Sequence, residues 1–401
     1  MRVLIAFDKF RGSLTAREAC ATAVHTLGSL HPDWELDACP LTDGGEGFAD
    51  ILTRAASGSI DEIRVSGPRG GPVLAPVGMV PAGGIPKAAL SLLDLPDGVS
   101  GTAPVAVVDM AAASGLSLIP PGLRDPWRAS SRGTGELMMA AARRGAAAIV
   151  LGVGGSGTHD LGLGALGALG LGFLGPEGRP MADPVPENWP GLSGFAGDVS
   201  IPMPPVRIAC DVSNPLLGER GAAAVFAPQK GLLPADLRRL ESETKRIAGM
   251  LCGHCGAPTG RADEPGSGAA GGLAFGLMIA ARARLLPGFP LVSAWLGLDA
   301  RLAASDLVLT GEGRFDAGSL GGKGPGALAA RAAALGTPVH IFAGEVEDGV
   351  RLYSVPHAAG GTLYNLTPSS LHAITPAGSA PEQALREAAE NLAAAIRRVL
   401  S

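Results

Sequence analysis

The chain has 401 residues, of which 46% are hydrophobic and 17% charged, and its formal net charge is −5. This length exceeds that of one ordinary hydrophobic core, so we expect two domains. The weakly acidic balance and the scattered basic residues argue against a nucleic-acid partner and favour small-molecule ligands.

The N-terminal part alternates between apolar strand-like runs and helical patterns. Residues 3–7 predict a buried strand, and 15–30 a helix capped by Ser13 or Thr15. Residues 34–41 predict a second strand, and another helix follows it. A β-α-β-α beginning is typical of a parallel sheet.

The pattern changes after residue 62, where strand-like pieces flank the turn-rich segment 67–72, which predicts a hairpin. Further strands are expected at 105–110, 146–153 and 206–210, and helices at 132–144, 237–251 and 268–285. From residue 307 the sequence again alternates between apolar strand-like runs and helical patterns, as in the N-terminal part. We therefore predict an α/β fold of two domains with the active site in the cleft between them. A Rossmann-like parallel-sheet domain, formed by 1–62 and 287–401, is interrupted by an α/β domain of 63–286 with a mixed sheet.

The most informative segment is 305–316, in which the apolar run 307–309 predicts a buried strand. Glu312, Arg314 and Asp316 follow it at alternating positions, with glycines between that would let the backbone turn. Open α/β sheets bind ligands beyond the carboxyl ends of their strands, so these charges are candidates for a site. The alternative is a solvated loop with a surface ion pair.

Other predicted strands also end in polar residues. These are Asp8, Lys9, Arg11 and Ser13 after the first strand, Asp43 and Glu46 after the second, Ser156, His159 and Asp160 after the strand at 146–153, and Asp211 and Asn214 after the strand at 206–210. A site dense in carboxylates, amides and backbone N–H groups suits a polyphosphate with a hard metal ion. Asp43 could instead cap a helix.

Two glycine-rich segments partly match nucleotide-binding motifs. Residues 152–157 match G-x-G-x-x-G after a strand, but the nearest acid for a ribose, Glu177, lies between Pro176 and Gly178 in a loop. An NAD-dependent dehydrogenase therefore stays an alternative with weak support. Residues 318–323 have one residue too few between the framing glycines for a standard phosphate loop.

The cysteines give a further alternative and an expected compartment. Cys252-Gly253-His254-Cys255 has the spacing of a dithiol or a zinc pair, but it follows a charged helical stretch, so we interpret it as a helix end. Five scattered cysteines favour a reducing compartment. No apolar run suggests a signal peptide or a membrane span, so we expect a cytoplasmic protein without a membrane partner. A homodimer is compatible with the sequence.

Taken together, the ordered motifs resemble those of the bacterial glycerate kinases of the type that includes glycerate 2-kinases, over essentially the whole chain. The matching blocks are 6–13, 42–47, 110–116, 133–137, 152–160, 209–216, 226–231, 268–272 and 306–323. The resemblance implies two α/β domains and transfer of the γ-phosphoryl group of ATP, with Mg²⁺, to a hydroxyl of D-glycerate, giving 2-phosphoglycerate.

The chain departs from that family pattern at a few positions. Lys9 and Arg11 stand where the family usually has Ser and Lys, and His159 and Gly318 replace amide side chains. Two alternatives therefore stay open: a kinase for a related small hydroxy acid, and a non-catalytic binder of such a ligand.

We predict the following roles. The catalytic group is Asp8, Asp211, Arg314 and Asp316, with Asp211 as the first candidate for the base. The acceptor is bound by Lys9, Arg11, Ser13, Asp43, Glu46 and Asn214. The nucleotide is bound by Gly154, Gly155, Ser156, Lys230, Gly268, Gly271, Gly272, Glu312 and Lys323. Magnesium is held by Asp43 and Asp211.

Overall fold

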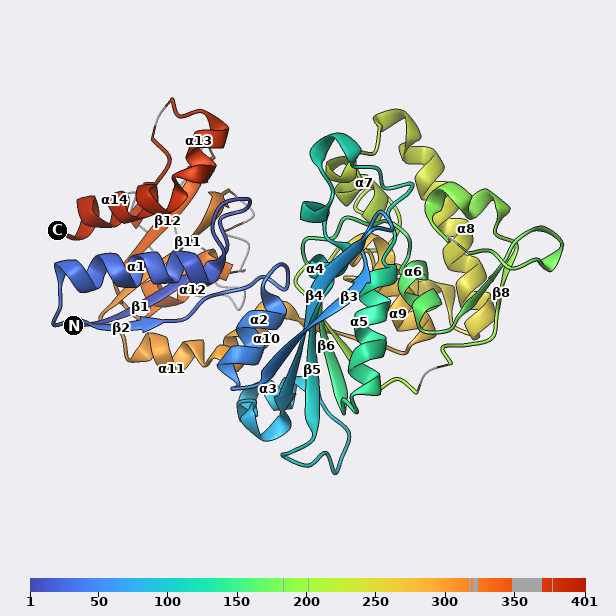
Figure 1. Cartoon of the computed structure of the whole chain (residues 1–401), viewed down its shortest axis with the longest axis horizontal. Helices are drawn as coiled ribbons and strands as arrows, with labels where there is room; N and C mark the ends of the chain where they lie inside the picture. Colours follow the sequence, from blue (N-terminus) through green and yellow to red (C-terminus); the bar gives the residue numbers. More distant parts are fainter. Residues whose placement is uncertain (183, 201, 317–318, 320–323, 348–369, 377) are drawn as a thin grey trace. The chain divides into compact units, whose positions relative to one another are not determined.

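The computed structural model describes residues 1–182, 184–200, 202–316, 319, 324–347, 370–376 and 378–401 (Figure 1). By their internal contacts these residues form two units, Met1–Asp43 with Val292–Ser401, and Gly44–Leu291. The predicted limit at 62/63 falls inside strand β3 (Ser59–Ser66), and the limit at 286/287 falls inside β10 (Arg284–Pro287). Both strands belong to the sheet of the second unit, so that unit extends beyond the predicted limits at both ends.

The first unit is built on a five-stranded parallel sheet with the order β13-β12-β11-β1-β2. Its strands are β1 (Arg2–Phe7), β2 (Glu35–Ala38), β11 (Leu307–Phe315), β12 (Val339–Val346) and β13 (Leu371–Ala373). Its helices are α1 (Ala16–Leu30), α11 (Leu298–Ala303), α12 (Gly324–Ala334), α13 (Pro381–Arg386) and α14 (Ala388–Leu400), and α10 (Gly288–Leu296) contains the limit between the units.

The core of this unit explains the order of its strands. Val3, Ile5 and Leu309 are fully buried, so the central strands β1 and β11 read as continuous apolar runs. Helix α1 packs on β1 and against α14, and α12 packs on β11 and β12. The predicted helix cap is confirmed: Thr15 accepts a hydrogen bond from the Glu18 N–H, and the Glu18 carboxylate accepts one from the Thr15 N–H.

Strand β11 is longer than the sequence predicted. It does not end at 309 but continues to Phe315, and Arg314 pairs with Glu345 of β12. A Cβ atom on Gly311 would lie 1.8 Å from the Phe342 carbonyl oxygen, and one on Gly313 would lie 2.8 Å from the Arg11 nitrogen. These glycines therefore permit close packing of extended backbone rather than a turn. Because side chains alternate along a strand, residues 312 and 314 share the opposite face.

The second unit contains a six-stranded mixed sheet with the order β10-β9-β6-β5-β4-β3. Besides β3 and β10, its strands are β4 (Pro72–Pro81), β5 (Pro104–Asp109), β6 (Ala148–Gly152) and β9 (Val206–Cys210), and β7 (Gly172–Leu174) pairs with β8 (Gly194–Ala196). Its helices are α2 (Phe48–Ala55), α3 (Lys87–Leu93), α4 (Met110–Ser114), α5 (Arg132–Arg143), α6 (Leu163–Ala168), α7 (Ala222–Phe226), α8 (Leu237–Cys255) and α9 (Leu273–Ala280).

The α/β class, the parallel sheet and the mixed sheet are as predicted. The hairpin at 67–72 joins the antiparallel strands β3 and β4, and β5, β6, β9 and β10 run parallel. The helix predicted over 268–285 is wrong at both ends, because α9 begins at Leu273 and ends at Ala280. Arg282 then adopts a left-handed conformation with φ +52°, and the chain enters the edge strand β10.

Within the described residues, no helix has both the length and the apolar character that a bilayer span requires.

Candidate active site

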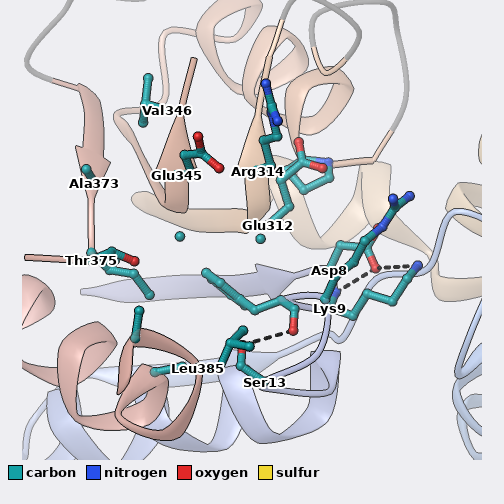
Figure 2. Close-up of a pocket in the computed structure, with 18 of the residues that line it drawn as sticks. Asp8, Lys9, Ser13, Glu312, Arg314, Glu345, Val346, Ala373, Thr375 and Leu385 are labelled. Carbon is teal, nitrogen blue, oxygen red and sulfur yellow. Dashed lines mark hydrogen bonds and ion pairs between the residues drawn. The ribbon is translucent and has the colours of Figure 1, made fainter. Parts of the chain in front are cut away.

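A cavity of about 950 Å³ lies in the first unit, where β1, β11, β12 and β13 end (Figure 2). Its charged lining consists of Asp8, Lys9, Arg11, Asp43, Glu312, Arg314, Asp316 and Glu345. The predicted residue Ser13 also lines it, and its hydroxyl donates to the Phe10 carbonyl at 3.0 Å. The structure thus brings the predicted groups after the first strand together with Asp43 and the charges of segment 305–316. The cavity is large enough for a small organic acid and part of a nucleotide.

Sheet topology explains this convergence. Strands β1 and β11 are parallel neighbours, with Phe7 opposite Gly311, and the Asp8 N–H donates to the Gly311 carbonyl at 2.9 Å. Asp8 and Glu312 are the next residues on the two strands. Two carboxylates separated by about three hundred residues in sequence therefore occupy corresponding positions at the same edge of the sheet.

Lys9 is held by two carboxylates. Its Nζ donates to Asp43 Oδ1 at 2.8 Å and lies 3.8 Å from Asp8 Oδ1. Burial lowers the pKa of Lys9, but the attraction of Asp43 and Asp8 outweighs it, so that pKa lies above its usual range. Asp43 is not the cap of α2, since that helix begins at Phe48 with Gly47 as its N-cap.

Two acids of the cavity have raised pKa values. Burial, opposed by the charge of Lys9 and reinforced by Asp43, raises the pKa of Asp8 to about 6. Burial also raises the pKa of Glu312 to about 7, against a hydrogen bond from Ser319 and with added repulsion from Asp8, Asp43 and Asp316. The Glu312 Oε1 atom is buried and has no hydrogen-bond partner among the described residues.

The cations at the rim of the cavity are more accessible. Arg11 is exposed, and the Arg314 side chain is 55% exposed, with its guanidinium 3.1 Å from the Glu347 carboxylate. The alternative of a surface ion pair in segment 305–316 therefore describes part of what Arg314 does. Asp316 Oδ1 accepts a hydrogen bond from the Ser319 N–H.

Sequence reasoning missed one charged residue and the apolar wall of this cavity. Glu345 follows Gly344 on β12, as Glu312 follows Gly311 on β11, so this repeated Gly-Glu pair could have indicated it. Val346 of β12 and Leu385 of α13 supply apolar surface (Figure 2), and Ile374, directly after β13, adds to it. Nothing in the local sequence of α13 signals that it lines a cavity.

The predicted acid Asp211 and amide Asn214 lie in the second unit. Both carboxylate oxygens of Asp211 lie within 2.9 Å of the Phe289 N–H, which donates to them near the start of α10. The Asn214 side chain donates to the Arg220 carbonyl. Glu46, the remaining predicted acceptor ligand of this unit, is half-buried. The ligand and catalytic roles of these residues stay predictions.

The predicted glycines of the nucleotide site are packed closely against other backbone in the second unit. A Cβ atom on Gly268 would lie 2.2 Å from the Pro215 carbonyl oxygen, and one on Gly271 would lie 2.1 Å from the Thr158 carbonyl oxygen. Gly272 and Gly154 are similarly confined, whereas Gly155 is exposed with φ +71°. Close packing alone accounts for glycine at 268 and 271, and phosphate binding stays a prediction.

Lys230, which was predicted to contact phosphate directly, is 2% exposed. Its Nζ donates to Ser156 Oγ at 2.7 Å and to the Thr158 carbonyl at 2.6 Å. Burial lowers its pKa to about 7, while attraction to Asp160 opposes the shift. In this conformation the Lys230 amine donates its hydrogen bonds to protein groups. Lys323 and Gly318 lie outside the described residues.

The residues present suit a magnesium ion that arrives with a nucleotide. No group of three or more His, Cys, Asp or Glu side chains in the described part of the chain could hold a metal ion. Mg²⁺ is usually bound by one or two carboxylates together with substrate phosphates and water. Burial and the charge of Asp43 raise the pKa of Asp8, so a cation beside this carboxylate would stabilise its ionised form.

Comparison with known proteins gives the family. The model of the glycerate kinase family matches residues 3–401. A glycerate kinase of Haemophilus influenzae is 37% identical over 86% of this chain and 86% of its own, and one of Bacillus subtilis is 35% identical over 97% and 94%. A glycerate 2-kinase of Escherichia coli is 34% identical over 87% of each chain. A solved structure assigned to glycerate kinase 2 of Salmonella typhimurium LT2 superposes with a TM-score of 0.72 and 33% identity, covering 100% of this chain and 97% of that one. The chain therefore belongs to the glycerate kinase family, which is a family of enzymes.

Proposed function

We propose that the protein transfers the γ-phosphoryl group of ATP, in the presence of Mg²⁺, to a hydroxyl of D-glycerate, and that the product is 2-phosphoglycerate. The observation that carries this proposal is the cavity of the first unit, which gathers carboxylates, two exposed guanidinium groups and an apolar wall. Phosphoryl transfer requires mainly positioning and neutralisation of charge, which is what this set of side chains offers. The 34% identity to a glycerate 2-kinase supports the choice of product.

We assign the acceptor carboxylate to Arg11 and Arg314 rather than to Lys9. The charge of Lys9 is already balanced by Asp43 and Asp8, whereas both guanidinium groups are accessible from the cavity. A guanidinium also binds a carboxylate through two parallel hydrogen bonds, which fixes the orientation of the substrate.

Asp8 is the residue that we expect to lie next to Mg²⁺. The ion would screen the phosphates and draw electron density from the transferred group. Asp43 then holds Lys9, and Asp316, hydrogen-bonded to Ser319, borders the phosphoryl position.

The departures of the chain from the family pattern bear on the acceptor. His159 is fully buried in the second unit, where its Nε2 lies 3.1 Å from Thr244 Oγ1 and burial lowers its pKa to about 3. Its Nδ1 atom is buried and has no hydrogen-bond partner among the described residues. Lys9 lines the cavity, so the alternative of a related small hydroxy acid rests on that position.

A coupled assay of ADP release over a panel of small hydroxy acids tests the proposal. We expect D-glycerate to give the highest kcat/KM, activity to require Mg²⁺, and ³¹P NMR to identify 2-phosphoglycerate. Absence of ADP release with every acid, or undiminished turnover in chelator, would contradict it. A product phosphorylated at the other hydroxyl would correct the position of transfer alone.

A further inference from the structure

We propose that Glu312 is the general base of the reaction, and that its carboxylate accepts the proton of the glycerate hydroxyl that attacks ATP. This inference rests on the proposed function. It transfers the role of base from Asp211 to an acid that the sequence analysis had assigned to nucleotide binding.

The first observation is the position of Glu312 in the cavity. It lies near the carboxyl end of the central strand β11, on the strand face opposite Gly311 and Gly313, and it lines the cavity together with Arg11 and Arg314 (Figure 2). The two groups assigned to the acceptor carboxylate and the candidate base therefore border the same space. A rigid central strand also holds such a group more precisely than a loop would.

The second observation is the unused hydrogen-bonding capacity of this side chain. Among the described residues Glu312 Oε1 is buried without a partner, although buried carboxylate oxygens are normally satisfied. Asp8 differs, because its Oδ1 accepts from the Lys9 N–H at 2.7 Å and lies 3.8 Å from the Lys9 amine. Asp211 differs as well, because it accepts from the Phe289 N–H. Glu312 Oε1 thus has hydrogen-bonding capacity that no described protein group uses.

Electrostatics supports the same assignment. Burial and the neighbouring carboxylates bring the pKa of Glu312 to about 7. A base is most effective when its pKa lies near the working pH, because it is then ionised in a large fraction of molecules and still binds a proton well. An ordinary surface glutamate, with a pKa near 4.3, would be a weaker proton acceptor.

The hydroxyl O–H bond breaks and its proton moves to Glu312, while the hydroxyl oxygen forms a bond to the γ-phosphorus. The bond between the γ-phosphorus and the bridging oxygen breaks, and ADP leaves with that electron pair. Glu312 returns the proton to solvent after the products leave, so each turnover yields phosphoglycerate, ADP and one proton.

The test compares the full-length wild type with Glu312→Gln, Glu312→Asp and Glu35→Gln. The last variant makes the same chemical change at a carboxylate of the same unit that is 68% exposed. Loss of a general base costs roughly 10²- to 10⁴-fold. We expect Glu312→Gln to lower kcat by at least about a hundredfold, with the KM values for glycerate and ATP and the Mg²⁺ concentration for half-maximal rate within about threefold of wild type. Glu312→Asp should recover part of kcat, and Glu35→Gln should match wild type.

The pH profile separates a base from a merely structural residue. Wild-type kcat/KM should fall below about pH 7 as Glu312 takes up a proton. The residual activity of Glu312→Gln should lack that fall. Circular dichroism and the melting temperature verify folding, and a neutral isostere of a buried acid should fold at least as well as wild type.

Three outcomes would overturn the inference. They are a Glu312→Gln kcat within fivefold of wild type, an unchanged acid limb in that variant, and a defect that saturating Mg²⁺ repairs, which would make Glu312 a metal ligand instead. A wild type that releases no ADP with any hydroxy acid would reject the proposed function and this inference together. An active wild type with an active Glu312→Gln rejects the inference alone.

Discussion

The polar residues that follow the strands of the two units have opposite environments. In the first unit, Asp8 and Glu312 border a cavity, and an oxygen of Glu312 has no partner among the described residues. In the second unit, Asp160, which follows β6, is buried and accepts hydrogen bonds from protein groups. The same sequence signal, polar residues directly after a buried strand, therefore marks a candidate site in one unit and a structural network in the other.

Hydrogen-bond partners distinguish the two cases better than position along the chain or burial does. A buried polar group with complete partners stabilises the fold, since its desolvation is offset by hydrogen bonds. A group that lacks a partner beside a cavity is held in an unfavourable state, which is what ligand binding can relieve. Substitution of Asp160 should therefore affect mainly stability, and substitutions at the cavity mainly turnover.

The largest effect is expected for Asp160→Ala. The Asp160 carboxylate accepts hydrogen bonds from the N–H and hydroxyl of Ser131 and from the N–H groups of Gly162 and Gly164, at 2.7–3.1 Å. Alanine would leave these buried donors unsatisfied, so the free energy of unfolding measured in urea should fall by at least about 3 kcal/mol. The control is Asp61→Ala, which removes an exposed carboxylate 3.5 Å from Arg144 and should change stability by less than about 1 kcal/mol. Equal losses in the two variants would contradict the comparison.

A somewhat smaller effect, this time on rate, is expected at the rim of the cavity. Arg314→Ala and Asp316→Asn should each lower turnover at least about a hundredfold, equivalent to roughly 2.7 kcal/mol, while the melting temperature barely moves. The exposed pair of Arg314 with Glu347 should contribute less than about 1 kcal/mol to stability. Glu347→Gln breaks the same ion pair and should keep turnover near wild type. If Arg314→Ala keeps normal turnover or melts far lower, Arg314 is structural.

The pH dependence of stability should have contributions of opposite sign from the two units. The pKa of Glu312 is raised to about 7, so the folded state binds a proton more tightly than the unfolded state, and stability falls as pH rises from about 4.5 to 7. The pKa of Lys230 is lowered to about 7, so the unfolded state binds the proton more tightly, and stability rises between pH 7 and about 10.5.

Urea unfolding from pH 5 to 10 tests both signs. The free energy of unfolding of the wild type should fall as pH rises toward 7, and Glu312→Gln should remove on the order of 2 kcal/mol of that fall. One pKa unit corresponds to about 1.4 kcal/mol, and solvent screens part of the shift. Lys230→Met should flatten the rise on the alkaline side. A Glu312→Gln variant with the full acid-side fall would show that other groups, Asp8 among them, cause it.

Much of the first unit and of its cavity could be predicted from sequence, because local rules determine both. Apolar runs identified β1 and β11, and the rule that ligands bind at the carboxyl ends of parallel strands indicated Asp8 and Glu312. The end of β11 was not predictable in this way. The sequence pattern could not show that Gly311 and Gly313 lie against neighbouring backbone, where they extend a strand instead of turning it.

Tertiary packing decides what the sequence could not show. The burial of Lys230 depends on the segment around Ser156 and Thr158, more than seventy residues away in the chain. The role of α13 in the cavity wall likewise depends on where the chain returns to the sheet after β13. Intrinsic propensity and local motifs carry no information about such distant contacts.

The smallest effect is expected for the cysteine pair near the end of α8, which also tests whether close spacing alone makes a site. Cys252 is buried in the core of the second unit with its Sγ 3.8 Å from the Pro258 carbonyl oxygen, and α8 ends at Cys255, followed by Gly256 in a left-handed conformation. Burial raises the pKa of both thiols, so neither is a ready thiolate for redox chemistry or metal binding. The double variant Cys252→Ala with Cys255→Ser should keep wild-type turnover and lose only about 1 kcal/mol of stability, from the smaller core side chain. Metal analysis and thiol titration of the wild type complete the test, because bound zinc or a disulfide together with a large loss of turnover in the variant would make this pair a site after all.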